Sequence, residues 1–157
     1  MKKYIMCLFL CACGFRPVFY GNTTDIYVPA ISGINGIELR NALNTKFGGQ
    51  KNENAPYVLT VTLELPETKY KALEPTGDAT WQEIMLRAKY QLTHNGEQIA
   101  SGTEVASESY TFVRYLVAAN ASYNNAVANT ITVLADKIGT RAIVAVSDYE
   151  NKNPVQK

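Results

Sequence analysis

Cysteine thiols are the most reactive side chains of this sequence, and all three lie close to the N-terminus. They occupy positions 7, 11 and 13, and no cysteine follows Cys13. A disulfide framework would distribute its cysteines through the fold, so this clustering does not indicate one. A thiolate is a strong nucleophile that a lipid donor can alkylate. The cysteines therefore favour a covalent modification near the N-terminus over a structural role.

Residues 1–12 have the composition of a secretory signal peptide. Two lysines precede a short apolar run that ends at Ala12. A membrane-spanning helix needs about 20 apolar residues, so a signal peptide is favoured. The sequence LCAC, ending at Cys13, resembles the bacterial lipobox, in which the last cysteine is lipidated. We expect lipidation at Cys13, and each buried CH₂ would add about 0.8 kcal/mol of membrane affinity. The alternative is a chance cysteine in an ordinary signal peptide.

Alternating apolar and polar residues predict three main strands. Residues 57–65 and 81–94 both alternate with a period of two, which is typical of half-buried antiparallel strands. The dipeptide Asn95-Gly96 follows directly and is a strong hairpin signal, because both residues tolerate positive φ. The returning strand is expected over residues 98–112. One face of this sheet should be apolar and the other polar.

Three features modify this simple pattern. A short apolar run at residues 25–31 predicts a further strand, which lies at a sheet edge or is bulged at Pro29, because proline cannot donate to a ladder. Residues 67–78 are polar and are expected to form a long connection. Gly102, within the returning strand, is interpreted as a possible bulge.

Two segments show helical periodicity. Apolar residues recur every three to four positions over residues 37–47 and 114–146. The expected order is β-α-β-β-β-α, and the fold class is an α+β two-layer sandwich: a four-stranded, mostly antiparallel sheet with two helices on one face. The predicted domain spans residues 25–147, after a lipid-anchored tether at 13–24 and before a flexible tail at 148–157. One face of the sheet is then left open or meets a partner.

Composition and motifs exclude several functional classes. Fifteen basic and fourteen acidic residues give a net charge of +1, so no nucleic-acid partner is expected. The sequence has no G-x-S-x-G, H-E-x-x-H or P-loop motif, and its single histidine, His94, is expected to be an exposed turn residue. Glu64 and Glu67 are interpreted as a solvated edge rather than a catalytic pair. We expect a binding protein, not an enzyme, with no cofactor and no metal.

A longer motif begins at Cys13. Residues 13–21 read CGFRPVFYG, which resembles the C-G-F-R-P-L-Y-G start of alphaproteobacterial-type members of the LPS-assembly lipoprotein family LptE, with Phe19 as an inserted residue. The expected order of elements is also similar. The resemblance implies a lipoprotein anchored at the periplasmic face of the outer membrane. It further implies a partner, the LptD β-barrel, which such proteins plug and help to assemble, and a role in lipopolysaccharide transport to the cell surface.

The plug role that this resemblance implies suggests candidate binding residues. A plug in a water-filled barrel should present polar, weakly charged surfaces. Arg87 and Lys89 lie on the polar side of one predicted strand, with Lys69 and Lys71 in the neighbouring connection. We hypothesise that these four residues bind lipopolysaccharide phosphates; the alternative is an ordinary solvated face. A second functional hypothesis is another envelope lipoprotein that acts as an activator or a secretion-pilot module.

Overall fold

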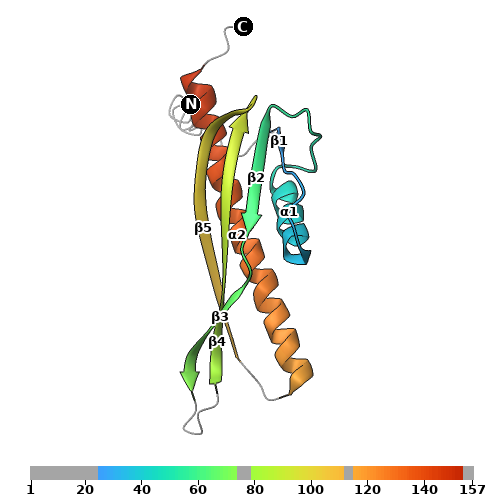
Figure 1. Cartoon of the computed structure of the whole chain (residues 1–157), viewed down its shortest axis with the longest axis vertical. Coiled ribbons are helices and arrows are strands. Elements are labelled where there is room, and N and C mark those ends of the chain that lie inside the picture. The colour runs from blue at the N-terminus through green and yellow to red at the C-terminus, as the bar shows by residue number, and fades with distance from the viewer. Residues whose placement is uncertain (1–24, 74–78, 112–114, 154–157) are drawn as a thin grey trace, which may run out of the picture.

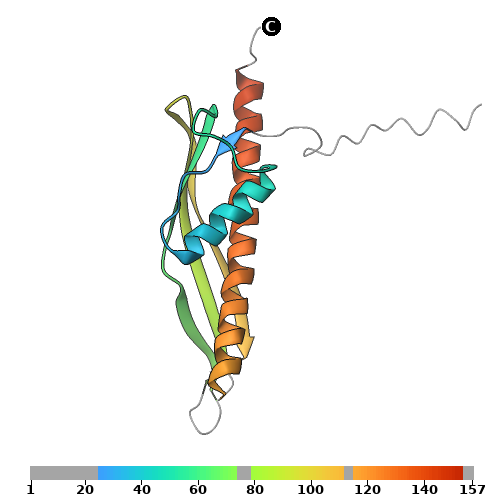
Figure 2. The same ribbon diagram turned by 90° about the vertical axis from the view of Figure 1, so that its right-hand side faces the viewer.

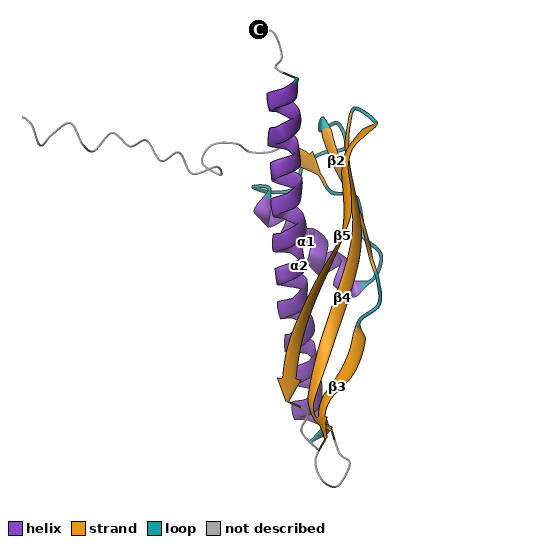
Figure 3. Ribbon diagram, turned by 90° about the vertical axis from the view of Figure 1, so that its left-hand side faces the viewer, coloured by secondary structure: helices purple, strands orange, loops and turns teal. Residues whose placement is uncertain are grey.

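A long helix and a twisted antiparallel sheet lie side by side along an elongated molecule (Figure 1). The computed structural model describes residues 25–73, 79–111 and 115–153, so Cys13, the signal segment and the tether lie outside the described residues. Its elements are β1 (Ile26–Tyr27), α1 (Ile34–Lys46), β2 (Tyr57–Leu63), β3 (Glu67–Leu73), β4 (Ala79–His94), β5 (Glu97–Thr111) and α2 (Leu116–Lys152). Both helices cover the same side of the sheet (Figures 2 and 3). The predicted α+β two-layer sandwich is confirmed, with five strands instead of four.

Strand β4 is the centre of the sheet. Strand β5 pairs with it along one edge over its whole length, and β2 and β3 follow one another along the other edge. All three pairings are antiparallel, whereas the two-residue strand β1 is parallel to β2 and lies outside it. The edge position that Pro29 predicts for the first strand is therefore confirmed, although the strand is shorter than residues 25–31.

The polar connection predicted after β2 was wrong in its first half, which forms strand β3. The chain advances four residues from Leu63 to Glu67, whereas their partners on β4, Ala88 and Met85, are three residues apart. One extra residue is therefore inserted where Pro66, which has no N–H, interrupts the ladder. Strands β2 and β3 are thus two halves of one long strand that pairs with the free edge of β4.

The β4–β5 hairpin forms as predicted, with φ values of 49° at Asn95 and 87° at Gly96. The bulge expected at Gly102 was wrong, because the register shift in this ladder lies nearer the turn, next to Leu92. Gly102 instead faces Tyr90 across the ladder. A Cβ atom at Gly102 would lie 2.9 Å from the Tyr90 hydroxyl oxygen, so glycine makes room for the ring.

The core lies between the helices and the covered face of the sheet. The apolar side of β4 is buried as its alternation predicts, and it packs against the apolar stripe of α2. Helix α1 adds its own buried residues beside α2. The largest fully buried side chains include Phe47, Leu39, Leu43, Leu59, Ile84, Leu86, Leu92, Leu134 and Ile138. Burial of this continuous apolar surface is the main term that stabilises the fold.

Both helices extend beyond their predicted limits. Helix α1 begins at Ile34, directly after Gly33, whose φ of 85° suits glycine. Helix α2 continues to Lys152, so the first residues of the segment predicted as a tail are helical. The first buried residue of α2 is Ala126, and its first turns project past the core.

Candidate functional site

The uncovered face of the sheet is continuous across three strands; its half nearer the hairpin is polar, whereas Trp81, Met85 and Val105 lie toward its other end. In register, Thr62 of β2 lies opposite Lys89 of β4, and Lys89 lies opposite Thr103 of β5. We call this surface the open face; its central residues are Thr60, Thr62, Arg87, Lys89, Gln91, Ser101 and Thr103. A shallow hollow of about 420 Å³ lies on it, over the part of the three strands nearer the β4–β5 hairpin. The polar rows predicted on β2, β4 and β5 are therefore brought together on one surface.

Arg87 and Lys89 do not stand alone on the open face. Glu64, just after β2, reaches both: its Oε2 lies 3.5 Å from Arg87 Nε, and its Oε1 lies 3.2 Å from Lys89 Nζ. The prediction of a purely solvated Glu64 was therefore incomplete. The carboxylate partly neutralises two of the four cations proposed to bind phosphate. All three side chains remain partly exposed, so each pair contributes no more than about 1 kcal/mol.

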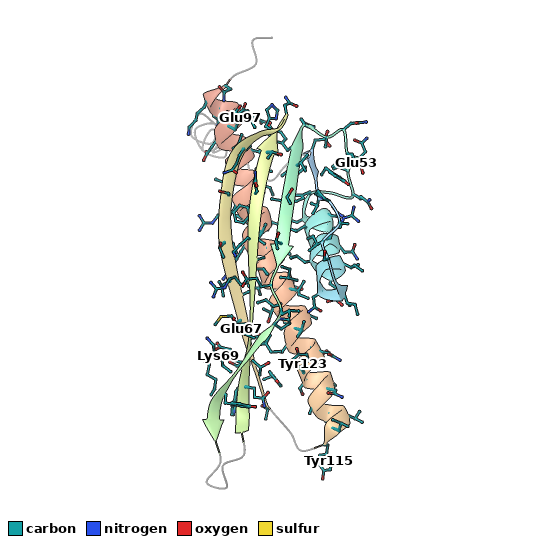
Figure 4. The ribbon with its side chains drawn as sticks, viewed as in Figure 1. Glu53, Glu67, Lys69, Glu97, Tyr115 and Tyr123 are labelled. Atoms are coloured by element: carbon teal, nitrogen blue, oxygen red, sulfur yellow. The ribbon has the colours of Figure 1, made fainter. Side chains whose placement is uncertain are left out.

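The other two predicted cations lie near the lower end of the same face. Lys69, labelled in Figure 4, is opposite Glu83 in the ladder. Lys71 Nζ lies 2.8 Å from Glu83 Oε2. The hydrogen bond from Lys71 holds the pKa of the Glu83 carboxyl below its ordinary value. Glu83 and Arg87 are four positions apart on β4, which is about 13 Å along a strand. The four cations thus share a face but form two groups, each with its own carboxylate.

The prediction of an exposed turn for His94 was wrong. Its ring lies between those of Tyr57 and Tyr149, with centroid distances of 4.6 and 5.0 Å, and its Nδ1 is buried without a hydrogen-bond partner. The Tyr57 hydroxyl donates to Glu150 over 3.1 Å. Burial first, and then this hydrogen bond, raise the pKa of Tyr57 to about 12. A hollow of about 360 Å³ adjoins the cluster, which ties the end of α2 to the sheet.

The described part of the chain shows neither a metal site nor a membrane-spanning helix. Within it, no three His, Cys, Asp or Glu side chains are placed to hold a metal ion. None of its helices is both long and apolar enough to cross a membrane. The open face, with its two groups of ion pairs, is therefore the best candidate site among the described residues.

Several solved structures of bacterial lipoproteins have the same fold as this chain. The chain shares it with rare lipoprotein B of Shewanella oneidensis, at a TM-score of 0.65 and 16% identity over 80% of this chain and 98% of that one. A protein of Caulobacter crescentus described as a lipoprotein gives 0.65 and 18%, over 80% and 92%. Lipoprotein B of Nitrosomonas europaea gives 0.62 and 13%, over 84% and 90%. No protein-family model and no curated protein sequence matches the chain. At these identities the likeness concerns the fold.

Sequence reasoning missed the carboxylates that pair with the cations. Glu64 was recognised only as an edge residue, and Glu83 was not singled out. A signal was present for Lys71 and Glu83, because residues 67–73 alternate like a strand, but that segment was interpreted as a connection. Cys13 lies outside the described residues, so its lipidation stays a prediction.

Proposed function

We propose that this chain is a bacterial envelope lipoprotein, and more specifically an LptE-type protein of the outer membrane. In this proposal Cys13 carries the lipid anchor at the periplasmic face. The observation that carries it is the conjunction of two features: the CGFRPVFYG start and a fold shared with rare lipoprotein B. Neither feature depends on the other, since the motif lies outside the residues that the structure describes.

The proposed partner is an LptD-type β-barrel, which the domain would plug and help to assemble during lipopolysaccharide transport. The open face supports this role because it is polar in the half nearer the hairpin, nearly balanced in charge and not covered by any helix of the described structure. The lumen of such a barrel is polar, so a plug can replace water contacts with hydrogen bonds there. We propose a binding role and no catalytic one.

A pull-down tests the partner. The C-terminally tagged chain would be extracted from outer membranes in mild detergent, and the co-purifying proteins identified. A large β-barrel in about one-to-one ratio is the expected result. A periplasmic partner without a barrel would contradict the plug and favour the activator or secretion-pilot hypothesis.

We further propose that Arg87 and Lys89 contact lipopolysaccharide phosphates, with Lys69 and Lys71 as a second group. The ion pairs with Glu64 do not prevent this, because a phosphate can replace an exposed carboxylate at low cost. The test is binding of labelled lipopolysaccharide to the Arg87→Ala/Lys89→Ala double variant. Equal binding by the variant and the wild type would exclude this role.

A further inference from the structure

The two outer edges of the sheet differ in how they are protected against pairing with another strand. Edge strands are commonly guarded by proline, lysine or irregular pairing. Strand β3 has all three: it follows Pro66, carries Lys69 and Lys71, and its pairing shifts register twice. Strand β5 has no proline, lysine or arginine, and its register shift lies at the hairpin end. The half of β5 that lies away from the hairpin, including Ser107 to Thr111, is therefore a regular edge without these protective features.

Ladder geometry shows which main-chain groups of β5 point outward. The Arg87 carbonyl accepts from the Glu64 N–H at 2.9 Å, so the main-chain groups of Arg87 face β2. Its opposite residue on β5 is Val105, whose N–H and C=O must therefore point away from β4. Lys137 Nζ lies 2.7 Å from the Val105 carbonyl oxygen, which agrees with this orientation. By alternation, Ser107, Ser109 and Thr111 also present their main-chain groups outward.

Charged residues of helix α2 contact the middle of this edge, and nearer the end of β5 the helix contributes Tyr123, whose ring packs against that of Tyr110. Lys137 covers Val105, and Arg141, one turn later, pairs with Glu104 over 3.3 Å. Below them, helix α2 has no charged residue before Asp136. Its first residues, Leu116 and Val117, are 76% and 83% exposed. Figure 3 views the molecule from this side, where no described strand lies outside β5.

We infer that the edge of β5 from Ser107 to Thr111 pairs with an extended strand of a partner protein. The outward main-chain groups would supply the hydrogen bonds, as in other cases of strand addition. Glu108 is the charged residue of this segment of β5, whereas Glu104 is paired with Arg141 and Glu97 lies at the hairpin end. The incoming strand is expected to carry a basic residue opposite Glu108. A second copy of this chain fits poorly, because its own β5 carries another Glu108 and no lysine or arginine to pair with the first.

This inference rests on the proposed function only for the identity of the partner, which would be the barrel. Ser109→Pro removes one outward N–H and leaves the ladder with β4 intact, since that ladder uses the alternate residues. Thr68→Pro is the matched control, because Thr68 points its main-chain groups outward from the guarded β3 edge. Ser109→Ala keeps the N–H and controls for the side chain. Thermal unfolding of each variant would establish that it folds.

Co-purification and amide hydrogen exchange together test the proposed strand pairing. Co-purification with the barrel should fall at least about tenfold for Ser109→Pro and little for the two controls. Amide hydrogen exchange at Ser107, Ser109 and Thr111 should be slowed about tenfold or more in the membrane-extracted wild type, relative to the chain purified alone after overproduction.

The outcomes separate this inference from the plug. Equal barrel recovery by all variants, or equally fast exchange of these amides in both samples, would overturn strand pairing and leave the plug in place. If the wild type recovers no barrel, the plug fails. Slowed exchange in the extract would then still support pairing with a different protein, and unchanged exchange would overturn it.

Discussion

The covered and open faces of the sheet are built from the same strands but held by different contacts. On β4, Leu92 is fully buried against the helices, while Gln91 beside it is exposed on the open face. The covered face is stabilised by apolar burial, whereas the open face carries exposed ion pairs that contribute little. The comparison teaches that the fold depends on one face, which leaves the other free to be specialised for binding.

The largest effect is expected when two neighbouring residues of β4, one on each face, are replaced separately by alanine. Leu92→Ala should lower the free energy of unfolding by about 2–5 kcal/mol, because it leaves a cavity in the core. Gln91→Ala should change it by no more than about 0.5 kcal/mol. Urea unfolding of both variants measures the difference. Similar losses would mean that the open face also supports the fold.

A second test adds volume to the covered face. Gly102→Ala would push a methyl group against the ring of Tyr90 and should cost about 1–3 kcal/mol. Ser101→Ala, one residue away on the open face, is the control and should be nearly neutral. A neutral Gly102→Ala would show that the Tyr90 ring shifts freely, contrary to a tightly packed covered face.

The aromatic cluster at the end of α2 predicts a pH effect. Tyr57 has a pKa of about 12 in the folded state, against an ordinary 10, so its protonated form is favoured by folding. Its contribution to stability is complete below pH 10 and is lost as the pH rises to 12. Tyr57→Phe should therefore lose less stability than the wild type over this interval. The free energy of unfolding of both proteins would be measured by urea unfolding at several pH values from 10 to 12. An equal decline with pH in the two proteins would contradict the prediction.

The smallest expected effect concerns the open face itself. Glu64→Gln removes the shared partner of Arg87 and Lys89, and should change the free energy of unfolding by less than about 1 kcal/mol. If the two cations bind phosphate, their release should raise the affinity for labelled lipopolysaccharide about two- to fivefold. Glu97→Gln, at the hairpin end, should leave affinity unchanged. An unchanged affinity for Glu64→Gln would favour the solvated-face alternative.

Much of the architecture could be predicted from local patterns. The period of two in β2 and β4 placed the buried and open rows correctly, and Asn95-Gly96 located the hairpin. The apolar stripe of α2 located the long helix, although its ends were misjudged, because helix ends depend on weak local preferences. Strand β3 was missed because its largely polar residues next to Pro66 were interpreted as a connection, although they alternate. Such a strand exists only because β4 offers it a free edge.

The candidate site was predicted less completely than the fold. Arg87 and Lys89 were placed on the open face by the alternation of their strand, whereas Lys69 and Lys71 were assigned to a connection, and the grouping of the four cations into two sets was not predicted. Glu64 and Glu83 lie beside these cations because strands distant in the sequence pair in a particular register. No local sequence pattern reveals that register. The contact of His94 with two tyrosine rings likewise depends on where helix α2 ends against the sheet.

By itself, the sequence determined the periodicities, the hairpin turn and the low net charge, because each depends on residues close together in the chain. It also contains the N-terminal motif on which the proposed lipid anchor rests. Tertiary structure alone decided that β2 and β3 share one edge of β4, that carboxylates neutralise the cations, and that the half of β5 away from the hairpin is a regular sheet edge. These features arise from pairing between segments far apart in the chain, and only the folded structure sets that register.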